Sequence, residues 1–220
     1  MIKTVILDLD GTLADTITDI RDGLNGMLGQ LGFPQVSKSD TLANINNGAF
    51  ELVRRSLPEK YRTDDDFVKI AKVIYEKYYA ECYNTQTAEY VGITEALKSL
   101  SDSKITLSVL SNKQDEFVKK IVAKLFPDIP FAFVMGQSDR FPTKPDPTSI
   151  LYILDSLGAS RCEAALVGDS NIDMLTARNA EIIPIGVAWG YRSKEILLEN
   201  GAKYIVSSPC ELTKITNLFK

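Results

Sequence analysis

The sequence predicts a doubly wound α/β protein with a parallel sheet and an inserted bundle of helices. Short runs of apolar and β-branched residues, each ending near Gly, Ser or Asp, recur along the chain and indicate buried parallel strands. Helical patterns lie between these runs, which is the alternation expected of an α/β fold. One long helical stretch without a convincing strand interrupts the alternation and predicts the insertion.

The strand pattern recurs in segments 4–9, 105–110, 131–135, 164–167 and 182–187. Helices are predicted at residues 115–126, 147–157, 172–179 and 194–200. Several of these helices open with Asp, Asn or Pro, and Gly201 follows the last one, as helix boundaries favour. We therefore expect a Rossmann-like core, in which strands and helices alternate along the chain.

The insertion lies between the first and second predicted strands. Residues 10–104 span roughly three times the ~30 residues that a βαβ unit needs, so about 60 residues are surplus. Helical patterns run through this stretch, from a capped start at Asp15 to residues 49–57 and then residues 64–83. We expect an α/β core of residues 1–14 and 84–220, and an inserted helical module of residues 15–83.

The composition limits the classes of partner. The 220 residues include 25 Lys and Arg against 29 Asp and Glu, which gives a net charge of -4, and the basic residues form no dense run. Nucleic acids and membrane surfaces are therefore disfavoured as partners. No stretch reaches the ~18 apolar residues of a membrane helix, and the first residues lack a signal-peptide pattern, so we expect a soluble cytoplasmic protein.

The sequence contains no histidine. Serine–histidine triads, cysteine–histidine pairs and histidine-ligated metals are excluded, so acid–base chemistry must use carboxylates, lysine, tyrosine or cysteine. Cys82, Cys162 and Cys210 are widely spaced and odd in number, which fits neither a zinc site nor a disulfide framework. We expect these cysteines to be reduced.

Asp8 and Asp10 follow the first predicted strand, directly before Gly11. Side chains two residues apart on a strand point the same way, so both carboxylates are expected at the carboxyl end of the strand. Such a pair repels unless a cation lies between the carboxylates or one of them holds a proton, and hard oxygen ligands suit Mg²⁺. The alternative is a pair of solvent-exposed aspartates that cap a loop.

The segment Asp8-Leu9-Asp10-Gly11-Thr12-Leu13 resembles the first motif of the haloacid dehalogenase superfamily. The resemblance implies that Asp8 is a nucleophile that forms an aspartyl-phosphate, and that Asp10 is a general acid and base. It also implies that the Asp10 backbone carbonyl binds Mg²⁺ and that Thr12 belongs to the phosphate-binding residues.

Three later segments resemble the remaining motifs of that family, in the family's order. Ser111 and Asn112 are expected to hold the transferring phosphoryl group, although an ordinary helix cap is the alternative for them. Lys144 is expected to place its charge near the nucleophile. Asp169 is expected to bind Mg²⁺, and Asp173 is either a second ligand or an acceptor that orients its neighbours.

The inserted helices resemble the cap of the subfamily that includes phosphoglycolate phosphatases and β-phosphoglucomutases. Residues 44–57 and 186–193 resemble phosphoglycolate phosphatases in particular, which implies a small phosphorylated metabolite as substrate, with phosphoglycolate as the leading candidate. Asn47 is expected to bind substrate at a helix start, with a simple turn and cap as the alternative. Arg54 and Arg55 fit a solvated helix face better than a carboxylate site.

Two other functions are also compatible with the sequence. A β-phosphoglucomutase-like phosphosugar mutase uses the same fold and nucleophile. A non-enzymatic receiver-like domain, phosphorylated on an aspartate, has a similar sheet and an acidic pocket. The long insertion and the paired Lys-Pro and Gly-Asp segments argue against the receiver. A monomer and a homodimer are both compatible with the sequence.

Overall fold

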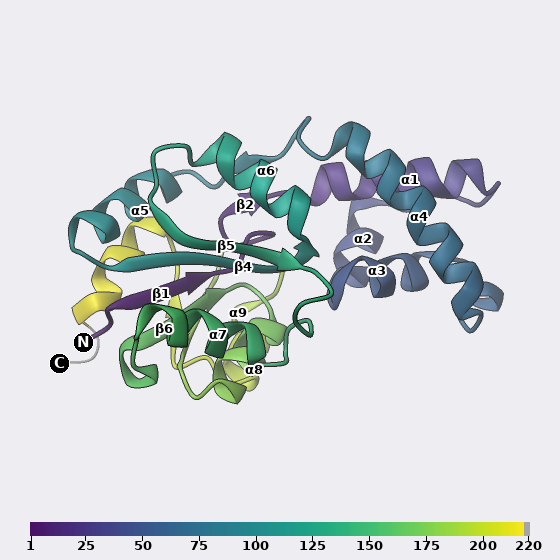
Figure 1. Ribbon diagram of the computed structural model, residues 1–220. Coiled ribbons are helices and arrows are strands. Elements are labelled where there is room, and N and C mark those ends of the chain that lie inside the picture. Colours follow the sequence, from purple (N-terminus) through teal and green to yellow (C-terminus); the bar gives the residue numbers. More distant parts are fainter. Residues whose placement is uncertain (218–220) are drawn as a thin grey trace. The chain divides into compact units, whose positions relative to one another are not determined.

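The computed structural model describes residues 1–217, and the chain divides into two compact units (Figure 1). The core unit comprises Met1–Asp15 and the chain from Glu89 onwards, and the helical unit comprises Thr16–Ala88. The helical module predicted from the sequence spans residues 15–83. No helix within residues 1–217 combines the length and the apolar character needed to cross a membrane.

The core unit is built on a six-stranded sheet of order β5-β4-β1-β6-β7-β8, in which all paired neighbours are parallel. The strands are β1 (Thr4–Leu7), β4 (Thr106–Gln114), β5 (Phe131–Gln137), β6 (Ala164–Gly168), β7 (Ile183–Val187) and β8 (Tyr204–Val206). The predicted doubly wound parallel sheet is confirmed. Strand β8 was not predicted, because three residues are too few to show a pattern.

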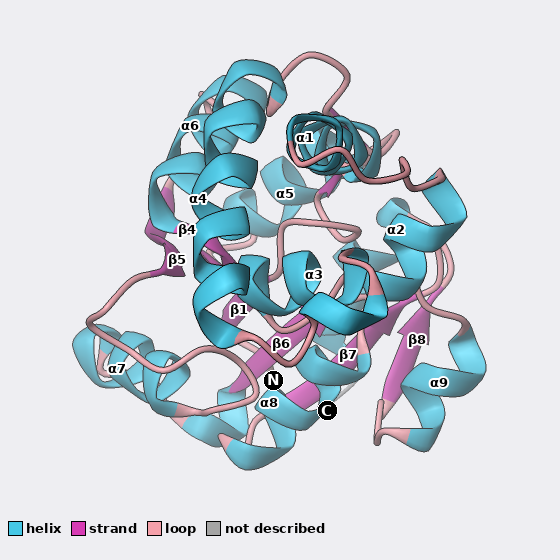
Figure 2. Cartoon of the chain, turned by 90° about the vertical axis from the view of Figure 1, so that its right-hand side faces the viewer, coloured by secondary structure: helices cyan, strands magenta, loops and turns pink. Residues whose placement is uncertain are grey.

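Helices cover both faces of this sheet (Figure 2). On one face lie α5 (Ile93–Asp102) and α6 (Asp115–Leu125), and on the other lie α7 (Thr148–Leu157), α8 (Asn171–Asn179) and α9 (Lys194–Glu199). Two 3₁₀ helices, Arg161–Glu163 and Pro209–Asn217, complete the unit. Ile6 and Leu166 of the sheet pack against Ile150 and Ile153 of α7 and Ala177 of α8, so the apolar strand residues found in the sequence form the core.

The order of the strands reverses at β1. The chain adds β4 and β5 on one side of β1, then crosses back and adds β6, β7 and β8 on the other side. In open α/β sheets, ligands bind beyond the carboxyl ends of the strands at such a point. Leu7, the last residue of β1, pairs with Val109 of β4 and Val167 of β6. The residues that follow these positions in the three strands therefore lie close together at the same edge of the sheet.

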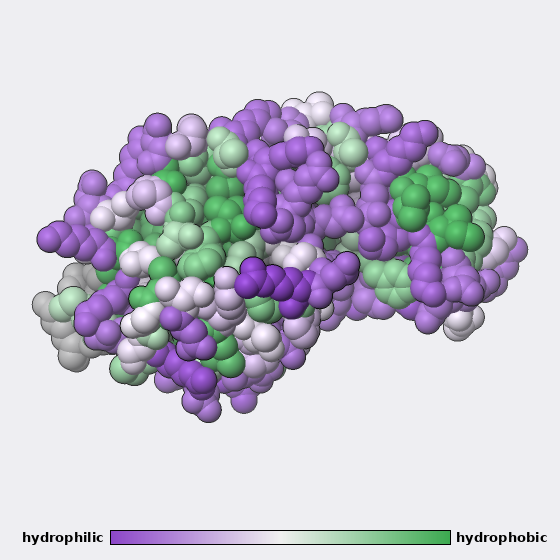
Figure 3. Space-filling view, in the orientation of Figure 1, coloured by the Kyte–Doolittle hydropathy of each residue, from purple (hydrophilic) through white to green (hydrophobic). Residues whose placement is uncertain are grey.

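The helical unit contains α1 (Ile17–Gln30), α2 (Lys38–Asn44), α3 (Gly48–Ser56), a 3₁₀ turn (Glu59–Tyr61) and α4 (Asp65–Cys82). The two long helices pack closely because Gly23 and Gly26 of α1 face Tyr79 and Tyr78 of α4. Figure 3 shows a hydrophobic area over α4, where Ile70 and Val73 are exposed, within a largely hydrophilic surface.

The chain enters and leaves the helical unit through two short paired strands, β2 (Ala14–Asp15) and β3 (Ala88–Glu89). Inside the unit, the buried carboxylate of Asp19 joins the first turn of α1 to the segment that precedes β3. Its oxygens accept hydrogen bonds from the amides of Thr85 (3.1 Å), Gln86 (2.9 Å) and Thr87 (2.9 Å), and from the Thr87 hydroxyl (2.7 Å). Since charge-assisted bonds are strong, Asp19 fixes the two ends of the unit to each other.

Candidate active site

Asp8 is the first residue after β1 and is buried. Its amide donates to the Val167 carbonyl of β6 at 2.9 Å, which holds Asp8 in line with the sheet. The chain then turns sharply, and Gly11 adopts a φ of 83°, a conformation that only glycine takes without strain. Because three amides of this turn donate to the Leu9 carbonyl, the backbone that presents Asp8 and Asp10 is fixed.

Three buried carboxylates meet where β1 and β6 end. Oxygens of Asp8, Asp169 and Asp173 lie within 4.8 Å of one another. The ammonium group of Lys144, also buried, lies 2.9 Å from Asp8 Oδ1 and 2.6 Å from Asp173 Oδ1. The structure therefore brings together four of the residues that the sequence singled out for catalysis and metal binding, from three different segments.

Burial and mutual repulsion oppose the charged forms of these carboxylates. Desolvation raises the pKa of Asp8 to about 7; Lys144 lowers it, and Asp173 raises it. Desolvation and the charges of Asp173 and Asp8 also raise the pKa of Asp169 well above its usual range. Burial alone would lower the pKa of Lys144, but Asp173 and Asp8 raise it above its ordinary value, so this lysine is protonated.

Asp169 and Asp173 come from the turn between β6 and α8, and their oxygens have different partners. Asp173 forms a capping box with Ser170, whose amide and hydroxyl donate to Asp173 Oδ2 at 3.1 and 2.6 Å. Asp173 Oδ1 accepts from Lys144. Asp169 accepts from the Tyr191 amide at 2.7 Å and from the Thr12 hydroxyl at 3.3 Å, so Thr12, expected among the phosphate-binding residues, faces a carboxylate.

Ser111 and Asn112 lie within β4, which was predicted to end at residue 110 but continues through Gln114. The Ser111 side chain is buried. The Asn112 amide group donates to the Lys144 carbonyl at 2.9 Å, and its oxygen accepts from the Lys144 amide at 2.8 Å. Asn112, expected to bind phosphate, thus has its side chain engaged in holding the backbone of Lys144.

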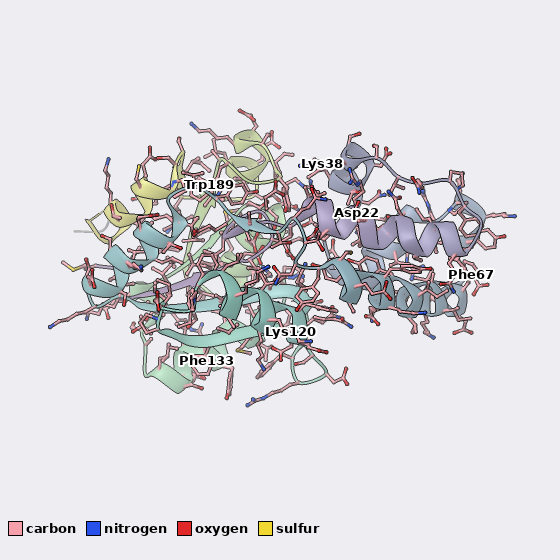
Figure 4. The ribbon with its side chains drawn as sticks, turned by 90° about the horizontal axis from the view of Figure 1, so that it is seen from above. Asp22, Lys38, Phe67, Lys120, Phe133 and Trp189 are labelled. Carbon is pink, nitrogen blue, oxygen red and sulfur yellow. The ribbon has the colours of Figure 1, made fainter. Side chains whose placement is uncertain are left out.

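Two further groups at the site were not predicted from the sequence. Lys113 forms an ion pair with Asp10. The loop after β7 supplies the Tyr191 amide to Asp169, and the Trp189 indole donates to the Thr12 carbonyl at 3.0 Å (Trp189 is labelled in Figure 4). Residue type does not reveal what a backbone amide binds, so the contact of the Tyr191 amide with Asp169 could not be predicted from the sequence.

Asn47 belongs to the helical unit, where it precedes α3 in a left-handed conformation with φ of 63°. Its side-chain oxygen accepts from Arg55 at 3.2 Å, and the same guanidinium donates to the Asn44 carbonyl at 3.2 Å. Arg55 therefore holds the loop that contains Asn46 and Asn47. The role of Asn47 toward a substrate stays a prediction.

The donor set at the core site suits a divalent cation. Among the described residues, Asp8 Oδ1 is buried and accepts no hydrogen bond of good geometry, although Lys144 lies beside it. The four carboxylates of Asp8, Asp10, Asp169 and Asp173 face two ammonium groups, those of Lys113 and Lys144. When the four carboxylates and the two ammonium groups are all ionised, two negative charges are in excess, which one divalent cation would neutralise. Hard oxygen donors are also the ligands that Mg²⁺ prefers.

Comparison with known families and proteins agrees with this geometry. A sequence-family model described as haloacid dehalogenase-like hydrolase matches residues 5–187, which include Asp8 and all four motif segments. The chain is a haloacid dehalogenase-like hydrolase. The similarity expected from the motifs is confirmed, and the chain is an enzyme, so a non-enzymatic receiver-like domain is not supported.

Curated relatives of this hydrolase carry one recurring name. Phosphoglycolate phosphatase of Vibrio parahaemolyticus is 28% identical, over 97% of this chain and 96% of the relative. Phosphoglycolate phosphatase of Psychrobacter arcticus is 32% identical, over 86% of this chain and 84% of the relative. The crystal structure of a predicted phosphoglycolate phosphatase from Haemophilus somnus has a TM-score of 0.89 at 26% identity and covers 98% of both chains.

Proposed function

We propose that this hydrolase is a Mg²⁺-dependent phosphatase that hydrolyses a small phosphate monoester through an aspartyl-phosphate on Asp8. The observation that supports this most is the position of Asp8. It is a buried carboxylate at the end of the central strand, 2.9 Å from the Lys144 ammonium group and close to two further carboxylates. A carboxylate so placed can attack phosphorus while a fixed positive charge stabilises the phosphoryl oxygens.

In the first step, an Asp8 oxygen forms a bond to phosphorus while the bond between phosphorus and the ester oxygen breaks. Asp10, two residues further along the fixed turn, gives its proton to the departing oxygen, which leaves as an alcohol. Ser111 and Lys144 hold the oxygens of the transferring group. The resemblance implies these roles, and the burial of Ser111 and Lys144 fits a site that excludes bulk water.

In the second step, water attacks the aspartyl-phosphate. Its oxygen forms a bond to phosphorus, the bond between phosphorus and Asp8 breaks, and Asp10 takes the proton of the water. Inorganic phosphate leaves, and Asp10 is again protonated for the next substrate. Two carboxylates therefore perform the covalent and the acid–base chemistry in a chain that contains no histidine.

Asp8, the Asp10 carbonyl and Asp169 are the proposed Mg²⁺ ligands. When bound, Mg²⁺ would supply positive charge that offsets the repulsion between carboxylates and the charge of the phosphoryl group. Both Asp173 oxygens already have donors, Lys144 and Ser170, so Asp173 is better suited to orient Lys144 than to bind the ion directly.

Phosphoglycolate is the leading candidate substrate, because the relatives that match nearly the whole chain bear the name phosphoglycolate phosphatase. A phosphosugar mutase is the alternative. A panel of small phosphate esters, assayed with Mg²⁺, distinguishes the two. Preference for phosphoglycolate with release of inorganic phosphate supports the proposal. Turnover of a sugar phosphate that depends on added bisphosphorylated sugar and releases no phosphate contradicts it.

The covalent route is tested by Asp8→Asn, in which the amide keeps the shape of the side chain but loses its nucleophilic charge. We expect kcat to fall at least about a thousandfold on p-nitrophenyl phosphate, with an unchanged circular dichroism spectrum. Rapid acid quench of the wild-type enzyme should trap the phosphoryl group on Asp8. A phosphoryl group trapped on any other residue would rule the route out.

A further inference from the structure

Lys113 lies near the end of β4 with its ammonium group against Asp10. Its Nζ atom is 2.9 Å from both carboxylate oxygens of Asp10. The side chains of Lys113 and Asp10 are 7% and 15% exposed, so solvent screens this pair far less than it screens a surface pair. A cation placed equally between both oxygens fixes the rotation of the carboxylate.

The extension of β4 explains why Lys113 reaches this place. β4 continues through Gln114 with an irregular pairing to β5 beyond Leu110, and the Lys113 amide donates to the Ser111 hydroxyl oxygen at 3.3 Å, so Lys113 lies beside Ser111. The Asp10 backbone is itself held by a bridge to Ala14. With the backbone of Asp10 fixed, the remaining freedom is the rotation of its side chain, which the contact with Lys113 restricts.

We propose that Lys113 is a positioning residue for Asp10, and that its contribution falls mainly on the hydrolysis of the aspartyl-phosphate. This inference rests on the proposed function. In that step Asp10 must be a carboxylate aimed at the attacking water, whose proton it takes as the new bond to phosphorus forms and the bond to Asp8 breaks. A cation that contacts both Asp10 oxygens holds the carboxylate in that orientation. The first step needs Asp10 less when the leaving group departs readily without a proton.

The test measures the two steps separately in single turnovers with p-nitrophenyl phosphate and Mg²⁺. Release of p-nitrophenolate reports formation of the aspartyl-phosphate, and acid-quenched phosphoenzyme reports its decay. Because p-nitrophenolate is a good leaving group, formation depends little on Asp10. We expect Lys113→Met to slow decay at least about tenfold, within the range of general base catalysis, and to slow formation much less. Phosphoenzyme should therefore accumulate.

A double-mutant cycle shows whether Lys113 acts through Asp10. In an Asp10→Asn background the amide cannot take the proton, so adding Lys113→Met should change the decay rate less than about twofold. Equal effects of Lys113→Met in both backgrounds would show that Lys113 acts independently of Asp10 and would overturn the proposal. So would a decay rate in the single variant equal to that of the wild type.

The matched control is Lys120→Met, which removes another lysine that pairs with a carboxylate, Glu116, on the exposed face of α6 (Lys120 is labelled in Figure 4). Both of its rates should equal those of the wild type. Lys113→Gln is the second variant should Lys113→Met not fold, and the same decay defect is expected. If the wild-type enzyme forms no phosphoenzyme on Asp8, the proposed function itself is refuted. If the wild-type enzyme forms it and the Lys113 variant decays at the wild-type rate, only the role of Lys113 is refuted.

Discussion

The two acidic residues after β6 differ in what holds them. Asp173 accepts hydrogen bonds on both oxygens from Lys144 and Ser170, whereas Asp169 faces the backbone amide of Tyr191 and lies beside Asp8. We expect Asp169→Ala to weaken Mg²⁺ activation more than Asp173→Ala does, because only the first removes a proposed ligand. The Mg²⁺ concentration for half-maximal activity measures this effect.

Asp173→Ala should instead lower kcat at saturating Mg²⁺, because it leaves the Lys144 ammonium group held by Asp8 alone. If Asp169→Ala and Asp173→Ala need the same Mg²⁺ concentration for half-maximal activity, Asp173 is also a direct ligand.

The residues that meet at the site could be predicted where strand ends decide their position. Asp8 and Asp169 follow parallel neighbours, β1 and β6, so they had to lie close together. The partners of Asn112 and Lys113 could not be predicted in this way. They depend on β4 continuing to Gln114, and the sequence Ser-Asn-Lys-Gln has no apolar pattern that indicates a strand.

The loop after β7 packs closely against two turns, those that contain Gly11 and Asp169. A Cβ atom at Gly190 would overlap the Asp169 side chain and lie 2.5 Å from the Gly11 carbonyl oxygen. Gly190→Ala should therefore push Asp169 away, destabilise the protein by about 1–3 kcal/mol and raise the Mg²⁺ requirement. Urea unfolding and Mg²⁺ titration measure both effects.

Gly29→Ala is the control for this substitution, because nothing lies within 4 Å of a Cβ atom there. Alanine favours helices more than glycine, so the control should unfold at equal or higher urea concentration, with unchanged Mg²⁺ dependence. A Gly190→Ala enzyme with the stability and the Mg²⁺ requirement of the wild type would show that the loop can move away from Asp169 without cost.

The loop before α3 is the element in which we expect substrate specificity. Asn47→Gly removes the side chain and keeps the left-handed backbone without strain, since φ is 63°. We expect it to change the order of preference among small phosphate esters by up to a few kcal/mol in kcat/KM, while activity on p-nitrophenyl phosphate falls much less. An equal loss on every ester would indicate that Asn47 is structural, in keeping with its contact to Arg55.

The elements themselves were predicted unevenly. Five of the six strands of the large sheet and helices α6 to α9 lie close to their expected places, because buried strands and amphipathic helices impose strong periods. Helices α2 and α5 were not predicted. Of the residues in α2, only Thr41 is buried, so its sequence shows no apolar stripe.

For the whole molecule, the raised pKa of Asp8 links stability to pH and metal. Without metal, folded Asp8 keeps a proton up to about pH 7 that the unfolded chain releases near pH 4. The folded state thus binds more protons in this window, and the contribution of Asp8 to stability falls as pH rises through it. Asp169 acts in the same direction.

The proposed Mg²⁺ ion would bind the ionised carboxylates, so its stabilising effect should grow from pH 5 to about pH 7 and then level off. The difference in thermal unfolding midpoint between Mg²⁺ and chelator, measured at pH 5, 6, 7 and 8, tests this expectation. Asp169→Ala should reduce the difference at every pH. A difference that is equally large at pH 5 and pH 8 would contradict the link to Asp8.

The contacts of Asp19 have a consequence for how the chain folds. About 100 residues separate β1 from β4, and the cost of closing such a loop grows with the logarithm of its length. Once Asp19 has bound the amides of residues 85–87, the two ends of the helical unit are joined. Only the residues between β1 and β4 that lie outside this unit, about 25 in number, then remain as a loop to be closed. The loop length is thus halved twice, which lowers the entropic cost of closing the loop by roughly 1.2 kcal/mol. A helical unit that forms early would thus bring the two neighbouring strands together, so the largest interruption of the sheet would speed its assembly.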